Sequence, residues 1–274
     1  MRTIALSPFI AILVIGCVSV HRTSPYDPVV NFRIVYANDA NGVQTFAILP
    51  STYDSGTPNR WVIYNHGFGQ IIDQLVTYDP QSRFLQSLTA AGFVVLASDY
   101  RNLACWGNQE CSEDMANLQV LWHLRLNLSA KPFVIGESMG GIVTWNAIAH
   151  GALKPLAVVG IYPVCSLAAM DKNAVLEPTI QSAYGFSAQT GYATATSGYD
   201  PMLAPASPYS SFPIAVWASY ADHVVVRSAN EDPFALKIQA AGGNVVIHTS
   251  SGEHGDLSNF DASSVVAFFR RSAQ

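Results

Sequence analysis

Charged residues are scarce in this chain. They make up 12% of its 274 residues, and the formal net charge is −5. Because nucleic-acid binding depends on clustered Lys and Arg, this composition argues against a nucleic-acid partner. Half of the residues are hydrophobic, and a chain of this length can bury most of its apolar surface in one core. No internal repeat or second domain boundary is visible, so we expect one domain over residues 31–274.

Patterns that bind metals are also missing. The four Cys form no C-x-x-C pair, and no H-E-x-x-H occurs. We therefore expect chemistry that needs neither a metal nor an organic cofactor. The sequence contains no signal that specifies an oligomeric state.

The apolar run at the N-terminus is too short to span a bilayer comfortably. It covers residues 9–16, follows Arg2, and is limited by Pro8. This pattern predicts an export signal over residues 1–16. We therefore expect the protein to be secreted, periplasmic or anchored to a membrane.

The end of this segment, Val14-Ile15-Gly16-Cys17, resembles a bacterial lipoprotein signal. In such a signal the Cys becomes the lipidated first residue, which would attach the protein to a membrane through Cys17. Ordinary cleavage nearby is the alternative. The polar, Pro-rich residues that follow, within 17–30, read as a tether.

Cysteine usage agrees with export. Cys105 and Cys111 enclose five residues, and in an oxidising compartment they would close a small loop. Two reduced surface thiols are the alternative. Cys165 is then left over, either as a small buried hydrophobe or as a competing partner for one of the pair.

Strands and helices alternate along most of the chain, which predicts a largely parallel sheet covered on both faces. Segments 32–37 and 43–49 precede this pattern and fit an antiparallel hairpin across a turn-rich connection. Further strands are predicted at 61–64, 93–97, 133–135, 155–161, 214–218 and 244–249, and helices at 80–91, 112–127, 142–150, 233–241 and 263–270.

Residues 166–212 lack a clear period and are rich in small residues, Tyr and Pro. This insertion follows the strand at 155–161. In a parallel sheet it would lie at the edge where the strands end, as a lid or a pocket wall. A plain solvated excursion is the alternative.

The most informative stretch is Gly136-Glu-Ser-Met-Gly-Gly141, between a short apolar strand and a helical segment. It has the form G-x-S-x-G, in which glycines let the strand and helix approach closely while the serine occupies a strained turn. The stretch resembles the nucleophile elbow of the α/β-hydrolase superfamily and is similar to the elbows of esterases, lipases and some polyester-degrading enzymes. The resemblance implies an α/β-hydrolase fold, with Ser138 as the nucleophile.

A serine nucleophile requires a base, and the base requires an orienting acid. The superfamily's chain order is Ser, acid, His, and Asp222, shortly after the strand at 214–218, resembles its acid turn. Asp200 and Asp256 are weaker candidates because neither directly follows a strand. The base is predicted to be His254, in a Gly-flanked loop after the last strand.

The loop His66-Gly67-Phe68-Gly69 follows the strand at 61–64 and resembles the superfamily's oxyanion loop. This resemblance implies that the backbone N–H groups of Phe68 and Met139 receive the developing oxyanion.

The function implied is an exported serine hydrolase that cleaves a small or polymeric carboxylic ester through an acyl-enzyme on Ser138. A peptidase or amidase of the same fold is one alternative. A catalytically silent exported protein that uses the scaffold for binding is the other.

Overall fold

The computed structural model describes residues 18–23, 31–187 and 191–273. The predicted signal segment and Cys17 lie outside the described residues. No helix in the described part is long and apolar enough to cross a membrane.

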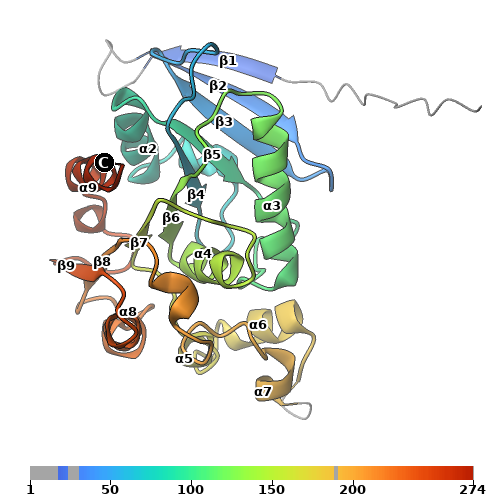
Figure 1. The fold of residues 1–274 in the computed structure, drawn as a ribbon. Coiled ribbons are helices and arrows are strands. Elements are labelled where there is room, and N and C mark those ends of the chain that lie inside the picture. Colours follow the sequence, from blue (N-terminus) through green and yellow to red (C-terminus); the bar gives the residue numbers. More distant parts are fainter. Residues whose placement is uncertain (1–17, 24–30, 188–190, 274) are drawn as a thin grey trace, which may run out of the picture.

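A nine-stranded sheet forms the centre of the described structure, in the order β1-β2-β3-β5-β4-β6-β7-β8-β9 (Figure 1). The strands from β5 to β9 in this order are parallel, and β1, β2 and β3 continue the sheet antiparallel. The strands are β1 (Val18–Thr23), β2 (Asn31–Asn38), β3 (Gln44–Pro50), β4 (Trp61–Asn65), β5 (Val94–Ser98), β6 (Phe133–Glu137), β7 (Ala157–Ile161), β8 (Ile214–Ser219) and β9 (Val245–Ser250).

Helices cover both faces of the sheet, as Figure 1 shows. The longer ones are α2 (Gln81–Ala90), α3 (Gln109–His123), α4 (Met139–Ala149), α6 (Glu177–Tyr184), α8 (Glu231–Ala240) and α9 (Ala262–Ser272). The short ones are α1 (Ile72–Leu75), α5 (Leu167–Met170) and α7 (Tyr192–Ala195), with 3-10 turns at Ser207–Tyr209, Arg227–Ala229 and Leu257–Asn259. This architecture confirms the predicted α/β class with its mostly parallel sheet and its antiparallel N-terminal hairpin.

The core divides into two layers because alternate side chains of a strand point to opposite faces. In β4, Trp61 and Ile63 face α3 and α4, whereas Val62 and Tyr64 face α2 and α9. Both faces are apolar, so the central strands read as continuous hydrophobic runs and not as alternating ones.

Two elements differ from the prediction. Val18–Thr23, which the sequence placed in the tether, forms β1 and pairs with β2 along its whole length, so that β2 is not left as an open sheet edge. Helix α3 ends at His123 and not near Asn127, because the backbone of Asn127 accepts a hydrogen bond from the Asn59 amide.

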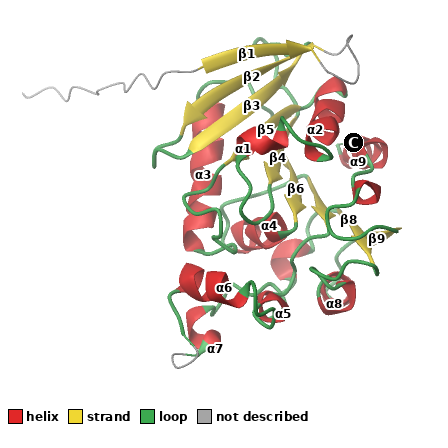
Figure 2. Cartoon of the chain, turned by 180° about the vertical axis from the view of Figure 1, so that it is seen from behind, coloured by secondary structure: helices red, strands yellow, loops and turns green. Residues whose placement is uncertain are grey.

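The insertion at 166–212 folds into α5, α6 and α7, with the 3-10 turn Ser207–Tyr209. In both views these helices gather beyond α4, at the end of the molecule opposite β1 (Figure 2). The insertion is thus a helical cap next to the carboxyl ends of the central strands.

Helix α9 is fixed to the sheet by aromatic packing. Phe269 is fully buried, and its ring stacks on Phe133 at 4.5 Å and meets Phe93 edge-on at 6.0 Å. The neighbouring Phe268 is only partly buried. The two adjacent phenylalanines therefore differ in how much of the helix–sheet contact each one provides.

We expect Phe269→Ala to lower the free energy of unfolding by about 3–5 kcal/mol, the usual cost of emptying a buried aromatic site. Phe268→Ala is the matched control and should cost less than half as much. Urea unfolding of both variants measures the difference. Equal losses would mean that α9 is not anchored through Phe269.

Candidate active site

Ser138 lies at a sharp turn between β6 and α4. Its φ of 51° falls in a region that residues with a Cβ rarely adopt. The backbone is held in place because the Ser138 amide donates to the Ile161 carbonyl at 3.0 Å, and the Ser138 carbonyl accepts from Val164 at 2.8 Å. A Cβ at Gly140 would clash with the Asn65 carbonyl, so only glycine permits this approach of α4 to the end of β4.

Three predicted residues form a hydrogen-bonded chain. The Ser138 Oγ lies 3.0 Å from His254 Nε2, and His254 Nδ1 lies 2.7 Å from Asp222 Oδ2. Because a carboxylate can only accept, the Nδ1 proton points to Asp222, and Nε2 is left to accept from the serine hydroxyl. This is the order of contacts that a serine nucleophile requires.

Asp222 is itself positioned by the backbone. It is 3% exposed, and its other oxygen, Oδ1, accepts from the amides of Val224 at 2.8 Å and Val225 at 2.9 Å. The weaker candidates lie elsewhere: Asp200 accepts from Tyr192 and Ala168 in the cap, and Asp256 caps a 3-10 turn.

The loop after β4 passes directly beside Ser138. A Cβ built on Gly67 would lie 3.4 Å from the Ser138 Cβ, and the Gly67 amide donates to Gln70 Oε1 at 2.8 Å. Met139 begins α4, where a first-turn N–H has no partner within the helix. The amides of Phe68 and Met139 therefore belong to two segments close to the serine, the loop after β4 and the first turn of α4.

A buried carboxyl group lies directly behind the serine. Glu137 is 3% exposed and accepts from Tyr64 Oη at 2.6 Å, Tyr162 Oη at 2.7 Å and Gln81 Nε2 at 2.7 Å. Burial raises the pKa of Glu137, and these three donors oppose that rise. The network connects β4, β6, α2 and the loop after β7.

Tyr162 connects this network to the base. Its ring packs on the His254 imidazole, with 4.4 Å between ring centroids, while its hydroxyl binds Glu137. Its backbone φ is also positive, at 36°. Of the four non-glycine residues with positive φ in the described part of the chain, Ser138, Tyr162 and Trp106 line one cavity. Backbone strain typically gathers at functional sites in this way.

That cavity has a volume of about 300 Å³ and is bounded by Ser138 and His254. Its apolar lining includes Phe68, Trp106 and Val224, together with Met170 and Leu176 from the cap. The insertion is thus a pocket wall and not only a solvated excursion. Across the residues that the structure describes, no group of three or more His, Cys, Asp or Glu could hold a metal ion.

Cys105 and Cys111 form a disulfide between β5 and α3, as predicted, and Cys165 is buried as a free thiol. Desolvation raises the pKa of Cys165 well above its usual value. It therefore belongs to the core and is not a partner for the other two.

Neither a protein-family model nor a curated protein matches this sequence. Solved structures do match. Brefeldin A esterase, a bacterial homologue of human hormone-sensitive lipase, superposes with a TM-score of 0.62 at 18% identity over 99% of this chain and 81% of its own. An esterase from Pyrococcus furiosus gives 0.64 at 18% identity over 93% and 96%, and one from the archaeon Pyrobaculum calidifontis gives 0.65 at 18% identity over 88% and 86%. The chain has the α/β-hydrolase fold.

Within this α/β-hydrolase fold, Glu137 and Gln81 are residues beside the site that were not predicted from the sequence. A signal for Glu137 was present, because an ionisable residue at the end of a short buried strand needs polar partners. Its partners come from elements far apart in the sequence, so they were not visible without the fold. His223, which follows Asp222, is exposed, lies 3.8 Å from Glu253 and does not line the cavity.

His66, at the start of the loop after β4, is fully buried. Its two ring nitrogens lie 3.0 Å from the carbonyl oxygens of Gly67 and Ser98. Burial lowers the pKa of His66 to about 4, and these two contacts only partly oppose the shift. The folded protein thus keeps this imidazole neutral at pH values where the unfolded chain would bind a proton.

Because the unfolded state binds more protons here between about pH 6.5 and 4, the free energy of unfolding should fall as the pH falls through this window. The full effect of His66 would be about 3 kcal/mol. We expect His66→Gln to flatten the pH dependence in urea unfolding. The exposed His248→Gln is the control and should retain the wild-type slope; an unchanged slope in His66→Gln would contradict the assignment.

Proposed function

We propose that this protein is a serine hydrolase that cleaves carboxylic esters through an acyl-enzyme on Ser138. The single observation that carries the proposal is the hydrogen-bonded chain from Ser138 through His254 to Asp222. It lies at the wall of a cavity large enough for a small ester group. The three esterases named above share the fold, which supports the proposal.

In the first step, His254 Nε2 takes the hydroxyl proton as the Ser138 Oγ attacks the ester carbonyl. The negative charge that develops on the carbonyl oxygen is received by the amides of Phe68 and Met139. Asp222 stabilises the imidazolium that forms and keeps its orientation. Collapse of the tetrahedral intermediate breaks the bond to the alcohol, which leaves with the proton from His254.

In the second step, His254 removes a proton from water as the water attacks the acyl-enzyme. The same two amides receive the oxyanion, and His254 returns the proton to Ser138 Oγ as the acid is released. Both carboxyl oxygens of Glu137 already accept hydrogen bonds from Tyr64, Gln81 and Tyr162, so we do not assign the proton transfer to Glu137. It holds Tyr162 against the base and thereby limits the motion of the imidazole.

We expect Ser138→Ala to lower kcat for a p-nitrophenyl ester by about 10⁶-fold and Asp222→Asn by about 10⁴-fold. A fluorophosphonate probe should label the wild type at Ser138. Asp256→Asn is the matched control, because it makes the same substitution on the His254 loop outside the hydrogen-bonded chain; it should retain activity.

A matched anilide tests the alternatives in the same assay. Faster cleavage of the anilide than of the ester would favour a peptidase or amidase. A folded wild type that neither turns over ester or anilide nor accepts the probe would favour a binding protein on the same scaffold. A probe adduct mapped to another residue would contradict the assignment of Ser138.

We further propose that the protein is exported, with Cys17 as the candidate site of lipidation and membrane attachment and ordinary cleavage nearby as the alternative. The apolar run at 9–16 and the V-I-G-C sequence support this proposal. The disulfide between Cys105 and Cys111 supports an oxidising compartment.

In a bacterial host fed a labelled fatty acid, the wild type should carry label and sediment with membranes, because two or more acyl chains on one Cys anchor a protein stably. Cys17→Ser should carry none. Wild-type protein that is soluble outside the cytoplasm would contradict lipidation, and cytoplasmic protein with reduced Cys105 would contradict export as well.

A further inference from the structure

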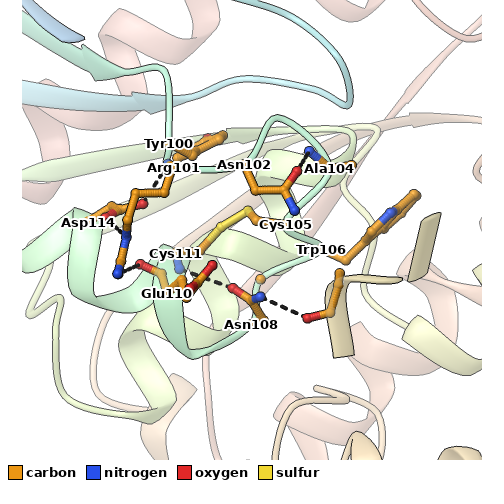
Figure 3. The surroundings of a disulfide bond; sticks show 12 residues. Tyr100, Arg101, Asn102, Ala104, Cys105, Trp106, Asn108, Glu110, Cys111 and Asp114 are labelled. Carbon is orange, nitrogen blue, oxygen red and sulfur yellow. Dashed lines mark hydrogen bonds and ion pairs between the residues drawn. A yellow bond between two sulfur atoms is a disulfide. The ribbon is translucent and has the colours of Figure 1, made fainter. Parts of the chain in front are cut away.

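The disulfide loop reaches the cavity through one side chain. Trp106 directly follows Cys105, and Figure 3 shows its ring projecting away from the disulfide. The indole is 1% exposed and lines the cavity that contains Ser138. Its backbone has a positive φ of 47°, which is costly for a residue with a Cβ. A strained conformation persists only where the surroundings fix it.

The surroundings of Trp106 fix it from both sides. The disulfide closes the chain around it, and Gly107 lies so close to α4 that a Cβ there would approach the Ile142 carbonyl to 2.7 Å. The indole Nε1 donates to Thr179 Oγ1 at 2.9 Å, and the Trp106 carbonyl accepts from Tyr184 Oη at 2.8 Å. Both of these partners belong to α6 of the cap.

The disulfide loop makes one more hydrogen bond to α6, through Asn108. The side chain of Asn108, at the start of α3, donates to the Ala183 carbonyl at 3.0 Å (Figure 3). The disulfide loop is therefore bonded to α6 at three points. One of these bonds holds the indole ring itself, and the other two hold the loop backbone and Asn108 beside it.

Trp106 also contacts the loop after β4, through Phe68. Its ring lies 5.6 Å from the Phe68 ring, at an interplanar angle of 30°. Phe68 is 40% exposed, whereas Trp106 is almost fully buried. Phe68 thus lies nearer the mouth of the cavity, and the indole of Trp106 forms part of its deeper wall.

The order of the strands in the sheet indicates which part of an ester would face Trp106, the acyl group or the alcohol. The loop that carries Trp106 follows β5, which lies on one side of β4 and β6. His254 follows β9, at the opposite edge of the sheet. The leaving alcohol must receive its proton from His254 and therefore lies on that side of Ser138. An acyl group that remains bonded to Ser138 would then extend away from His254, on the side of the loop that carries Trp106.

We propose that Trp106, held by the Cys105–Cys111 loop and by Thr179, limits the length of the acyl group, so that the site takes short-chain carboxylic esters. This inference rests on the proposed ester hydrolysis at Ser138. Shortening the side chain opens the cavity toward α6, and the extra room should be used by longer acyl chains. The alcohol side of the site is unaffected.

The test is a series of p-nitrophenyl esters from acetyl to octanoyl. We expect Trp106→Ala to raise the ratio of kcat/KM for octanoyl over acetyl by about tenfold or more, since even one methylene in an apolar pocket changes kcat/KM by this factor. Trp106→Phe, which keeps an aromatic ring, should shift the ratio in the same direction by less. If Trp106→Ala does not fold, the ratio measured for Trp106→Phe still tests the inference.

Trp122→Phe and Trp122→Ala are the matched controls. Trp122 is equally buried, and its indole also donates to a threonine, Thr45 Oγ1 at 3.1 Å, but it does not line the cavity. Loss of stability alone lowers turnover of all chain lengths alike, so these controls should keep the wild-type ratio. The double variant Cys105→Ala/Cys111→Ala should shift the ratio toward that of Trp106→Phe, because the indole is still present but the loop that carries it is less constrained.

A second series of acetate esters with alcohols of increasing size tests the orientation, and its profile should not change in Trp106→Ala. An altered alcohol profile with an unchanged acyl profile would overturn the inference. So would an acyl ratio that stays at the wild-type value in both Trp106 variants of an active enzyme. If the wild type shows no Ser138-dependent turnover of any ester, the proposed function is wrong, and the inference about Trp106 is wrong for that reason.

Discussion

The backbone conformation of Ser138 is the constraint on which the site depends. A positive φ at a residue with a Cβ costs about 1–3 kcal/mol. Here it is maintained by two hydrogen bonds, from the Ser138 amide to the Ile161 carbonyl and from the Val164 amide to the Ser138 carbonyl, and by the close approach of Gly140 to β4. These contacts join β6, β7 and α4 into one rigid corner. The corner presents the hydroxyl to the cavity, and every other group in the site is positioned relative to it.

Parallel strands bring those other groups to the same edge. The loops after β4, β6, β8 and β9 carry Gly67, Ser138, Asp222 and His254, and all leave the sheet at its carboxyl end. Short loops on a rigid sheet keep distances such as 2.7 Å between His254 and Asp222. The Glu137 network adds a second support behind the site. A buried carboxyl with three donors ties neighbouring strands and α2 together, and such fully satisfied polar networks rigidify a structure.

The remaining walls of the cavity are formed by the insertion and the disulfide loop. The insertion contributes Met170 and Leu176 directly, and α6 reaches the site only through its bonds to the disulfide loop. The disulfide loop and the insertion thus meet at one residue, Trp106. A small covalent loop that carries the strained Trp106 lets the wall be rigid although it consists of irregular structure.

The sequence by itself determined the order of strands and helices, the elbow with its glycines, and the Cys105–Cys111 pair. Each of these is local: a period of hydrophobicity, a backbone conformation that needs glycine, or a short spacing. It also indicated Asp222 and His254, through their places in chain order. Only the tertiary structure decided that Val18–Thr23 joins the sheet, which partners bury Glu137, and which side chains line the cavity. Those contacts join residues far apart in the chain, and no local pattern encodes which strand or loop will lie beside which.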